Sequence, residues 1–527
     1  MRTAGAPLLP ALALVLMVVS FGVYSNAIPN GFVFDDHPQI VENPWIRDPG
    51  SIPEIFVSHT AGFGHGERAN YYRPLKLLAY TLAYRLFGLE PWGFHLVNVI
   101  FHAAASALVF FLILALLRQA RTEETAASTR VWASFLAALL FAVHPIHTEA
   151  VTWVASFPEV SFAVFYLISL YGYIRWRSQA SEWAYALSLF SYLLAVFSKE
   201  PALTLPLLLP VYDYLFLERR VRAGDLARYA PYMAIIGLYS GMRFAALGGF
   251  AQVTRYADLS AFDHAINVLP LFARYLEKLV LPLGLNFFHV FHPIRGLLEP
   301  RAIASIAVTL AFAILTLTAY RKNRPAFVGL VIFVVPLLPV LYIAGVGENT
   351  FAERYLYLPS VGLSVVVAAL WATVRDRKPR WIEISTVALL VLAGLYAAGT
   401  LTRNRVWKDD LRLWSDTVAK SPDGYLPHTH LGDALMETGR TDDAIEHYRA
   451  ALALRPGAVS AHNNLGLAYK NLGRIDEAIE SYLTALGLYP DHAGLSYNLA
   501  NAYELKGMHE KAEEYRRKAR DMERRLH

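Results

Sequence analysis

Apolar segments of about 17 to 25 residues recur as far as residue 401, and they constrain this chain more than any other feature. The first covers residues 8–24 and contains no charged side chain. A helix of this length and composition can cross the hydrocarbon core of a bilayer. The chain is 55% hydrophobic and only 17% charged, so a purely water-soluble protein is disfavoured.

Eleven membrane spans are predicted from these segments. They cover residues 8–24, 92–117, 131–148, 153–174, 183–198, 201–217, 229–248, 303–320, 326–343, 356–374 and 382–401. Segment 265–282 is ambiguous, because Arg274, Glu277 and Lys278 suit an interfacial or re-entrant helix better than a lipid-exposed span. We expect the first span to be an uncleaved helix that enters from the cytoplasm.

Lysine and arginine concentrate in the short connections after every second predicted span. The positive-inside rule assigns these connections to the cytoplasm. With eleven crossings of the inner (cell) membrane, the chain after residue 402 is expected in the periplasm or at the cell exterior. The net charge of +5 is then explained by the residues that flank the spans, and we expect no nucleic-acid partner. The absence of cysteine excludes disulfides and thiolate metal sites.

The connection 25–91 is predicted to be an outer loop that is long enough to carry function. Leucines recur with helical spacing near its end, at Leu75, Leu78, Leu82 and Leu86. This spacing predicts a helix over 75–88 that lies in the membrane surface.

A 34-residue period begins after residue 420. Leu431, Gly432, Ala444, Tyr448, Ala451 and Pro456 recur as Leu465, Gly466, Ala478, Tyr482, Ala485 and Pro490. This pattern resembles the tetratricopeptide repeat, in which the tyrosine fills a groove that the glycine leaves between two helices. The fold prediction is therefore all-α: a polytopic transmembrane bundle over 1–402, followed by a tetratricopeptide-repeat α-solenoid over 403–527.

Most of the unusual polar residues fall on the predicted outer side. Ionisable groups at membrane depth are costly unless they face a cavity, so their convergence on one side predicts a wet site there. The candidate residues are Asp35, Asp36, Arg73, His95, His144, His147, Glu149, Lys199, Glu200, Glu353 and Arg354.

Each candidate also has a purely structural interpretation. The two adjacent aspartates could form a solvated turn, and Lys199–Glu200 and Glu353–Arg354 could be ion pairs at helix ends. His95 is equally compatible with an interhelical hydrogen bond. We favour hydrogen-bonded turn histidines over metal ligands for His144 and His147, because the intervening Pro145 disrupts helical ligand geometry.

The sequence contains no nucleotide-binding glycine loop, no GxSxG and no HExxH. A lipid-carried substrate fits better, with a carboxylate as general base at the membrane surface and cations around a phosphate leaving group. No cofactor is required for such chemistry. A divalent metal is compatible with it but is not indicated.

Several segments together resemble a known family. FVFDD, YYRPL, FHLVNVIFH, HPIHTEAV, FSKE and AERYLYLP, followed by the repeats, resemble the GT-C superfamily of polyprenyl-phosphate-sugar glycosyltransferases and are similar to the transmembrane and tetratricopeptide-repeat (TMTC) O-mannosyltransferases. The resemblance implies that Asp35 is the catalytic base beside Asp36. It also implies a phosphate and sugar pocket that includes Arg73, His147, Lys199 and Arg354.

The activity implied is transfer of a sugar from a polyprenyl-phosphate carrier to a protein serine or threonine outside the cytoplasm, with the repeats binding the acceptor protein. The alternative is a membrane-anchored tetratricopeptide scaffold for envelope protein assembly. A third hypothesis is a transporter or flippase. Such proteins often contain an inverted repeat, and the sequence shows none.

Overall fold

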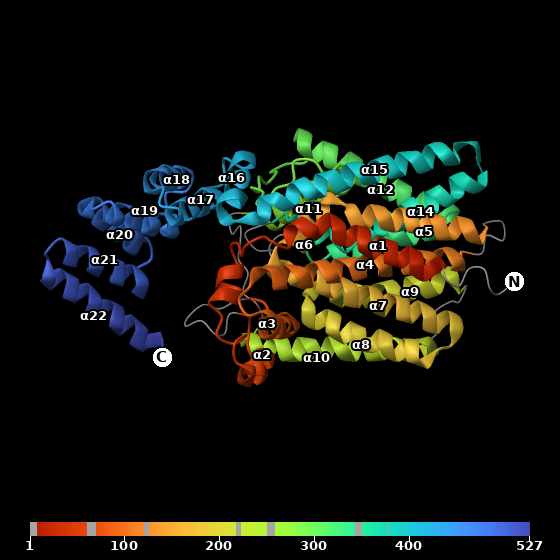
Figure 1. Ribbon diagram of the computed structural model, residues 1–527, viewed down its shortest axis with the longest axis horizontal. Coiled ribbons are helices and arrows are strands. Elements are labelled where there is room, and N and C mark those ends of the chain that lie inside the picture. The colour runs from red at the N-terminus through yellow and green to blue at the C-terminus, as the bar shows by residue number, and fades with distance from the viewer. Residues whose placement is uncertain are drawn as a thin grey trace. The chain divides into compact units, whose positions relative to one another are not determined.

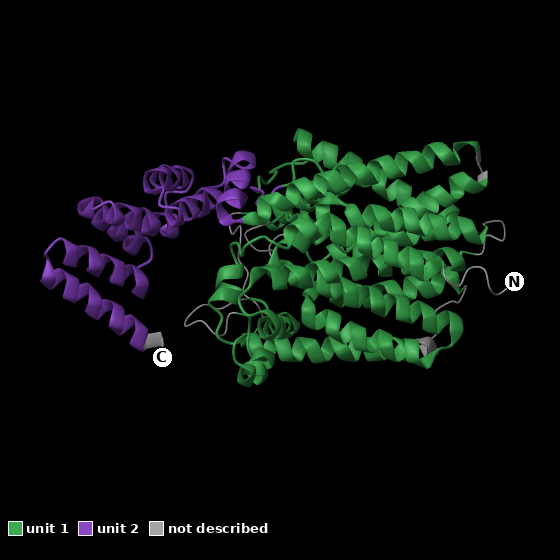
Figure 2. Ribbon diagram, in the orientation of Figure 1, with its two compact units in different colours: residues 1–285, 291–408 green, residues 286–290, 409–527 purple. Residues whose placement is uncertain are grey.

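The computed structural model describes residues 8–60, 70–120, 126–217, 223–249, 259–342, 350–377 and 379–526. Within these ranges every regular element is a helix, which confirms the all-α prediction. The chain forms two compact units (Figure 2). Unit 1 comprises residues 1–285 and 291–408, and unit 2 comprises residues 286–290 and 409–527. Residues 61–69 of the predicted outer loop lie outside the described residues.

Unit 1 is a bundle whose longer helices run in a common direction (Figure 1). These helices are α1 (Leu8–Tyr24), α4 (Pro91–Gln119), α5 (Ala127–Val143), α7 (Phe157–Gln179), α8 (Glu182–Ser198), α9 (Leu205–Phe216), α10 (Ala230–Leu247), α11 (Ala261–Val280), α12 (Pro300–Lys322), α13 (Arg324–Val334), α14 (Pro359–Arg377) and α15 (Ile382–Asn404). Every predicted span overlaps one of them, and the ambiguous segment 265–282 overlaps α11.

Fewer helices than predicted meet the length and composition needed to cross a membrane. Among the described residues, five do: Leu8–Ala27, Pro91–Gln119, Val154–Gln179, Pro300–Lys322 and Ile382–Lys408. A sixth is added if Ala127–Val143 and Pro145–Thr152, bent by 48°, form one broken span. The remaining predicted spans lie on helices that do not meet this criterion among the described residues. Short helices are one reason, because the 12 residues of α9 extend only about 18 Å against a hydrocarbon core of about 30 Å.

The outer helices of the bundle expose apolar side chains. Only 17% of the apolar window of α12, and 17% of that of α15, is buried inside the protein. Leu310 and Ile314 of α12 and Val387 and Leu395 of α15 are all more than half exposed. Apolar surfaces of this extent are stable in contact with lipid rather than water.

Short helices and turns gather at one end of the bundle. Figure 1 shows α2 (Ile52–Val57), α3 (Pro74–Phe87) and α6 (Thr148–Thr152) at this end, whereas the turn between α7 and α8 lies at the other. α3 is seen nearly end-on and so crosses the bundle direction. Its Lys76 and Tyr80 are buried, while Leu82 and Leu86 are 61% and 64% exposed. An outward apolar face is the arrangement expected of a helix that lies in a membrane surface.

Unit 2 consists of paired helices: α16 (Asp410–Lys420), α17 (Tyr425–Glu437), α18 (Thr441–Leu454), α19 (Val459–Asn471), α20 (Ile475–Leu488), α21 (Ala493–Leu505) and α22 (His509–Leu526). A Cβ atom on Gly432 would lie 2.4 Å from the Tyr448 ring, and one on Gly466 would lie 2.7 Å from the Tyr482 ring. Each glycine thus permits the close helix contact that the 34-residue period predicts.

The segment Asn286–Val290 also belongs to unit 2, although it precedes the repeats by more than a hundred residues. The side chain of Asn286 donates a hydrogen bond to Ser421 Oγ at 2.9 Å. The Phe287 ring lies 5.3 Å from the Trp414 ring. No periodicity in the sequence indicates this insertion.

Replacing the glycines of unit 2 tests the packing. Gly466→Ala is expected to lower the free energy of unfolding of the repeats by about 1–3 kcal/mol, because the Tyr482 ring must move. Gly487→Ala is the matched control: its helical position has open space around the added methyl group, so a gain of about 0.5–1 kcal/mol is expected. Urea titration of the full chain with pulse proteolysis of the repeats measures both. Equal effects of the two substitutions would contradict the packing described.

Candidate functional site

The acidic pair after α1 divides into one buried and one half-buried carboxylate. Asp36 is fully buried, and its carboxylate accepts hydrogen bonds from the backbone N–H of Val33 at 3.0 Å and of Ala155 at 2.6 Å. Burial raises the pKa of Asp36 to about 8, and the two backbone donors oppose this rise. Asp36 therefore connects the turn to the segment after α6, while Asp35 remains half-buried.

The residue before Asp35 has an unusual backbone conformation. Phe34 has a φ of 49°, in the left-handed region that costs a non-glycine residue about 1–3 kcal/mol. Its ring lies 6.2 Å from that of Trp153. Such a conformation persists only where the surroundings fix it, and it is found preferentially at functional sites. The turn that presents Asp35 is thus held by both a side-chain anchor and ring packing.

A lysine of α3 lies beside the acidic pair. The Lys76 ammonium donates a hydrogen bond to Gln39 Oε1. Burial lowers the pKa of Lys76 to about 7, and the carboxylates of Asp35 and Asp36 counteract this effect. Arg73 and Glu200 also act on the Lys76 charge, so the acidic turn and the start of α3 share one electrostatic environment.

Three cations at this end of the bundle are each paired with a carboxylate. Arg73 donates to Glu200 from Nε at 3.2 Å and from Nη2 at 2.8 Å. Lys199 donates to Glu159. Arg354 donates to Glu149 from Nη1 and, at 2.9 Å, from its backbone nitrogen. These pairs are buried or nearly so, since the cation side chains are 15%, 6% and 17% exposed.

Glu159 and Tyr355 connect two of these pairs. Glu159 Oε1 accepts from Lys199 and lies 3.8 Å from Arg354 Nε. The Tyr355 ring lies 4.7 Å from Lys199 Nζ and 4.9 Å from Arg354 Cζ. Burial, together with the charges of Arg73 and Arg354, lowers the pKa of Lys199 to about 8 despite the opposing effect of Glu159. Glu159 thus interacts electrostatically with all three cations. We refer to Arg73, Lys199, Arg354, Glu149, Glu159 and Glu200 as the ion-pair cluster.

The three candidate histidines lie outside the ion-pair cluster. His95 Nε2 hydrogen bonds with Gly31 O at 3.2 Å, and His144 Nε2 bonds with Leu279 O at 3.1 Å. His147 Nε2 bonds with Ser360 Oγ at 2.8 Å. All three rings are buried and link helices or turns. Among the described residues, no group of three or more histidines and carboxylates could hold a metal ion.

The structure adds residues that sequence reasoning missed. Glu159, Lys76 and Tyr355 were not among the candidates, although Glu159 is the only carboxylate in the predicted span 153–174. A lone acid inside an apolar span is a functional signal in its own right. Glu353, which was a candidate, is buried and interacts electrostatically with Glu149.

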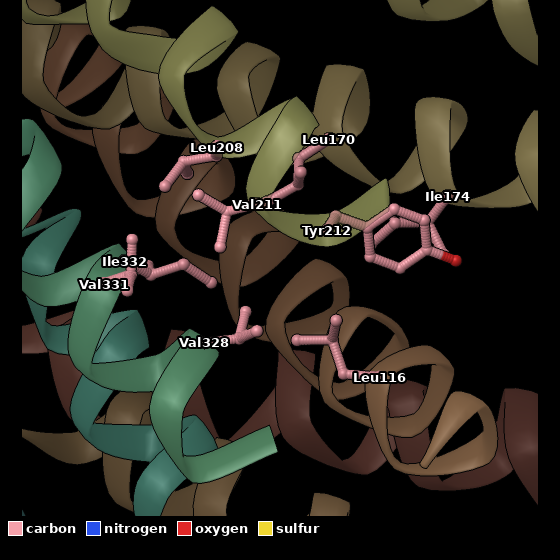
Figure 3. A pocket seen from close by; sticks show the side chains of 9 residues that line it. All are labelled: Leu116, Leu170, Ile174, Leu208, Val211, Tyr212, Val328, Val331 and Ile332. Atoms are coloured by element: carbon pink, nitrogen blue, oxygen red, sulfur yellow. The ribbon is translucent and has the colours of Figure 1, made fainter. Parts of the chain in front are cut away.

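An apolar hollow lies apart from these charges. It is formed between α4, α7, α9 and α13 and is lined by Leu116, Leu170, Ile174, Leu208, Val211, Tyr212, Val328, Val331 and Ile332 (Figure 3). No charged side chain lines it, so it offers no group for acid–base chemistry. The ion-pair cluster with Asp35 is therefore the candidate site.

The fold and the cluster define a helical protein with apolar, membrane-length helices, a buried charged site at one end of the bundle, and tetratricopeptide repeats. A tetratricopeptide-repeat family model matches residues 429–491 and 467–523. The crystal structure of MamA, 25% identical, covers 29% of this chain and 85% of that chain with a TM-score of 0.21.

The resemblance to TMTC O-mannosyltransferases is confirmed over most of the chain. Protein O-mannosyl-transferase F38B6.6 of Caenorhabditis elegans is 27% identical over 454 residues, which cover 84% of this chain and 62% of that protein. Protein O-mannosyl-transferase TMTC1 of Homo sapiens is 28% identical over 512 residues, which cover 86% of this chain and 56% of that protein. The chain thus spans somewhat more than half the length of these relatives.

The two aspartates are expected to respond differently to replacement by asparagine. In Asp36→Asn, the side-chain NH2 group replaces one of the two oxygens, so one of the two backbone N–H groups loses its acceptor. This loss should lower the free energy of unfolding by about 1–3 kcal/mol. Asp35→Asn should change it by clearly less, because the Asp35 side chain is only half-buried whereas that of Asp36 is fully buried. Thermal unfolding of both variants in the same detergent checks this. A larger loss for Asp35→Asn would show that the two roles are assigned the wrong way round.

Proposed function

We propose that this protein is an integral membrane glycosyltransferase that moves a sugar from a polyprenyl-phosphate carrier to a protein serine or threonine. The observation that carries the proposal is the half-buried Asp35 at the end of the apolar helix bundle that also contains three carboxylate-paired cations, with Asp35 and Arg73 both acting on the charge of Lys76. The names of the relatives support protein O-mannosylation as the reaction class. We place the site and the repeats on the extracytoplasmic side of the inner membrane.

In the proposed reaction Asp35 is the general base. Its carboxylate takes the proton of the acceptor hydroxyl while the hydroxyl oxygen attacks the anomeric carbon. The bond from that carbon to the phosphate oxygen breaks, and its electron pair leaves with the polyprenyl phosphate. Attack from the face opposite the leaving group inverts the anomeric configuration.

The ion-pair cluster would receive the charge that develops on the departing phosphate. Arg73, Lys199 and Arg354 are already oriented by Glu200, Glu159 and Glu149, so little reorganisation is needed when an anion arrives. Arginine forks suit the planar geometry of phosphate oxygens, and the lysine supplies a compact charge. His95, His144 and His147, predicted to bind substrate, would then act by supporting the surrounding turns.

The surfaces of unit 1 suit a lipid-linked donor. The apolar side of α3 and the exposed faces of α12 and α15 would contact the bilayer that contains the polyprenyl chain. The repeats would bind the acceptor protein, as tetratricopeptide arrays commonly bind polypeptides. The alternative, a membrane-anchored scaffold, gives no reason for burying several ionised groups, each of which costs free energy to desolvate.

Removing the base is the first test. Asp35→Asn should lower transfer of mannose from polyprenyl-phosphate mannose to an acceptor protein by about 10²–10⁴-fold. Glu42→Gln is the matched control, because Glu42 is an exposed carboxylate of the same loop and its loss should leave the rate unchanged. The assay uses the purified full chain in nanodiscs. Wild-type rates in Asp35→Asn would contradict the proposal, and no transfer by the wild-type protein from any polyprenyl-phosphate sugar would favour the scaffold.

The pKa of Lys199 predicts an alkaline limit to donor binding. Because this pKa is about 8, the cation is present below pH 8 and is lost as the pH rises above it. The apparent KM for the donor should therefore rise by about fivefold between pH 8 and 9, and by about tenfold for each further pH unit. In Lys199→Arg the guanidinium stays charged, and the rise should move to higher pH. An identical pH profile in both proteins would show that Lys199 does not bind the donor.

A further inference from the structure

The end of α15 is joined to the chain around the acidic turn by one buried asparagine. Asn404 is fully buried. Its side-chain Nδ2 donates to Val23 O at 3.1 Å and to Asn26 Oδ1 at 2.8 Å. Its Oδ1 accepts from Thr152 Oγ1 at 3.0 Å, and its backbone oxygen accepts from Asn30 Nδ2 at 3.1 Å. One residue thus connects the end of α1, the loop that leads to Asp35, and α6.

The turn after α15 (Arg405–Lys408) extends this connection. The backbone N–H of Gly31 donates to Lys408 O at 2.9 Å, while the carbonyl of Gly31 bonds with His95 at 3.2 Å. A Cβ atom at Gly31 would lie 3.3 Å from Lys408 O. The chain four residues before Asp35 is therefore held through both the N–H and the C=O of Gly31, in two successive peptide groups.

The indole rings of Trp407 and Trp153 connect the turn after α15 to the ion-pair cluster. Trp407 is 1% exposed, and its ring stacks on Trp153 with centroids 6.0 Å apart and planes inclined by 23°. The Trp153 ring lies 6.2 Å from the Phe34 ring and 5.4 Å from Arg354 Cζ. Trp153 thus contacts both the residue next to the proposed base and a cation of the ion-pair cluster.

We propose that Asn404 and Trp407 are positioning residues of the transfer site. Asn404 fixes the loop that presents Asp35, and Trp407 fixes Trp153, which separates that loop from Arg354. Neither residue needs to touch substrate. Their effect is on the distance between base and cations, and an error of about 1 Å in such a distance can lower a rate by about 100-fold. This inference rests on the proposed function.

The segment 404–408 is also the covalent connection to unit 2, because Lys408 is followed directly by Asp409, the first residue of unit 2 after α15. The residues that end unit 1 and lead into the repeats are thus the residues that hold the acidic turn. Substitutions in residues 404–408 are therefore expected to lower the transfer rate more than substitutions elsewhere in α15.

The test compares three substitutions in the full chain. Asn404→Ala removes the side-chain bonds to Val23, Asn26 and Thr152, and Trp407→Phe keeps an aromatic ring but reduces the stacking area. Thr402→Ala is the matched control, because its hydroxyl is exposed and bonds only within α15, to Ala398 O at 2.9 Å. We expect kcat to fall by about 10- to 100-fold in Asn404→Ala, less in Trp407→Phe, and not in Thr402→Ala. The KM for the acceptor should stay unchanged in all three.

A second measurement does not depend on activity. Hydrogen–deuterium exchange of the Gly31 and Val33 amides should become faster in Asn404→Ala and stay at the wild-type rate in Thr402→Ala. Unchanged kcat and unchanged exchange in Asn404→Ala would overturn the inference, as would a fall in kcat that Thr402→Ala reproduces. If the wild-type protein transfers no sugar, the proposed function fails, and exchange alone decides: faster exchange supports the positioning role, and unchanged exchange overturns it.

Discussion

Pairing each buried cation with its own carboxylate is the interaction on which this site depends. An isolated ion in a low-dielectric interior costs several kcal/mol even after relaxation, so Arg73, Lys199 and Arg354 could not lie between apolar helices without partners. Glu200, Glu159 and Glu149 supply those partners from three different parts of the chain. The same pairing that makes burial tolerable also orients the cations before any substrate arrives. It further requires the helices bearing these residues to meet at one end of the bundle.

The acidic turn illustrates how two adjacent and chemically identical residues acquire different roles. The Asp36 carboxylate accepts hydrogen bonds from two backbone N–H groups, one of them in a distant segment, and so has a structural role. Asp35 is left half-buried after a residue with a left-handed backbone. The strain at Phe34 is balanced by the anchor two residues later and by Trp153. The orientation of Asp35 therefore depends on the hydrogen bonds of Asp36 and on the packing of the Phe34 ring near Trp153.

Much of the architecture could be predicted from the sequence because periodicity and length are local properties. Long apolar runs located the helices, and the 34-residue period identified the contacts of Gly432 and Gly466. The site was predictable as a set of polar residues on one side. Their pairing was not, because whether Lys199 meets Glu200 or Glu159 depends on how α7 and α8 pack, which no spacing specifies. For the same reason the histidines could not be separated from the charged residues, and Glu159 was overlooked inside an apolar run. The predicted crossings outnumber the described helices that are long and apolar enough to cross a membrane, since hydrophobicity alone does not distinguish a full span from a short helix inside the bundle.

The insertion of residues 286–290 into unit 2 has a consequence for how such proteins diversify. Because the repeat unit includes a strip of chain encoded between α11 and α12, its sequence is discontinuous. A single recombination at the boundary after Lys408 would replace Trp414 and Ser421 but leave Asn286 and Phe287 unchanged. The contacts between these residues would then have to form between sequences of different origin. Exchange of the repeats between relatives is therefore expected to require compensating changes at residues 286 and 287, unless the segment that carries Trp414 and Ser421 is retained.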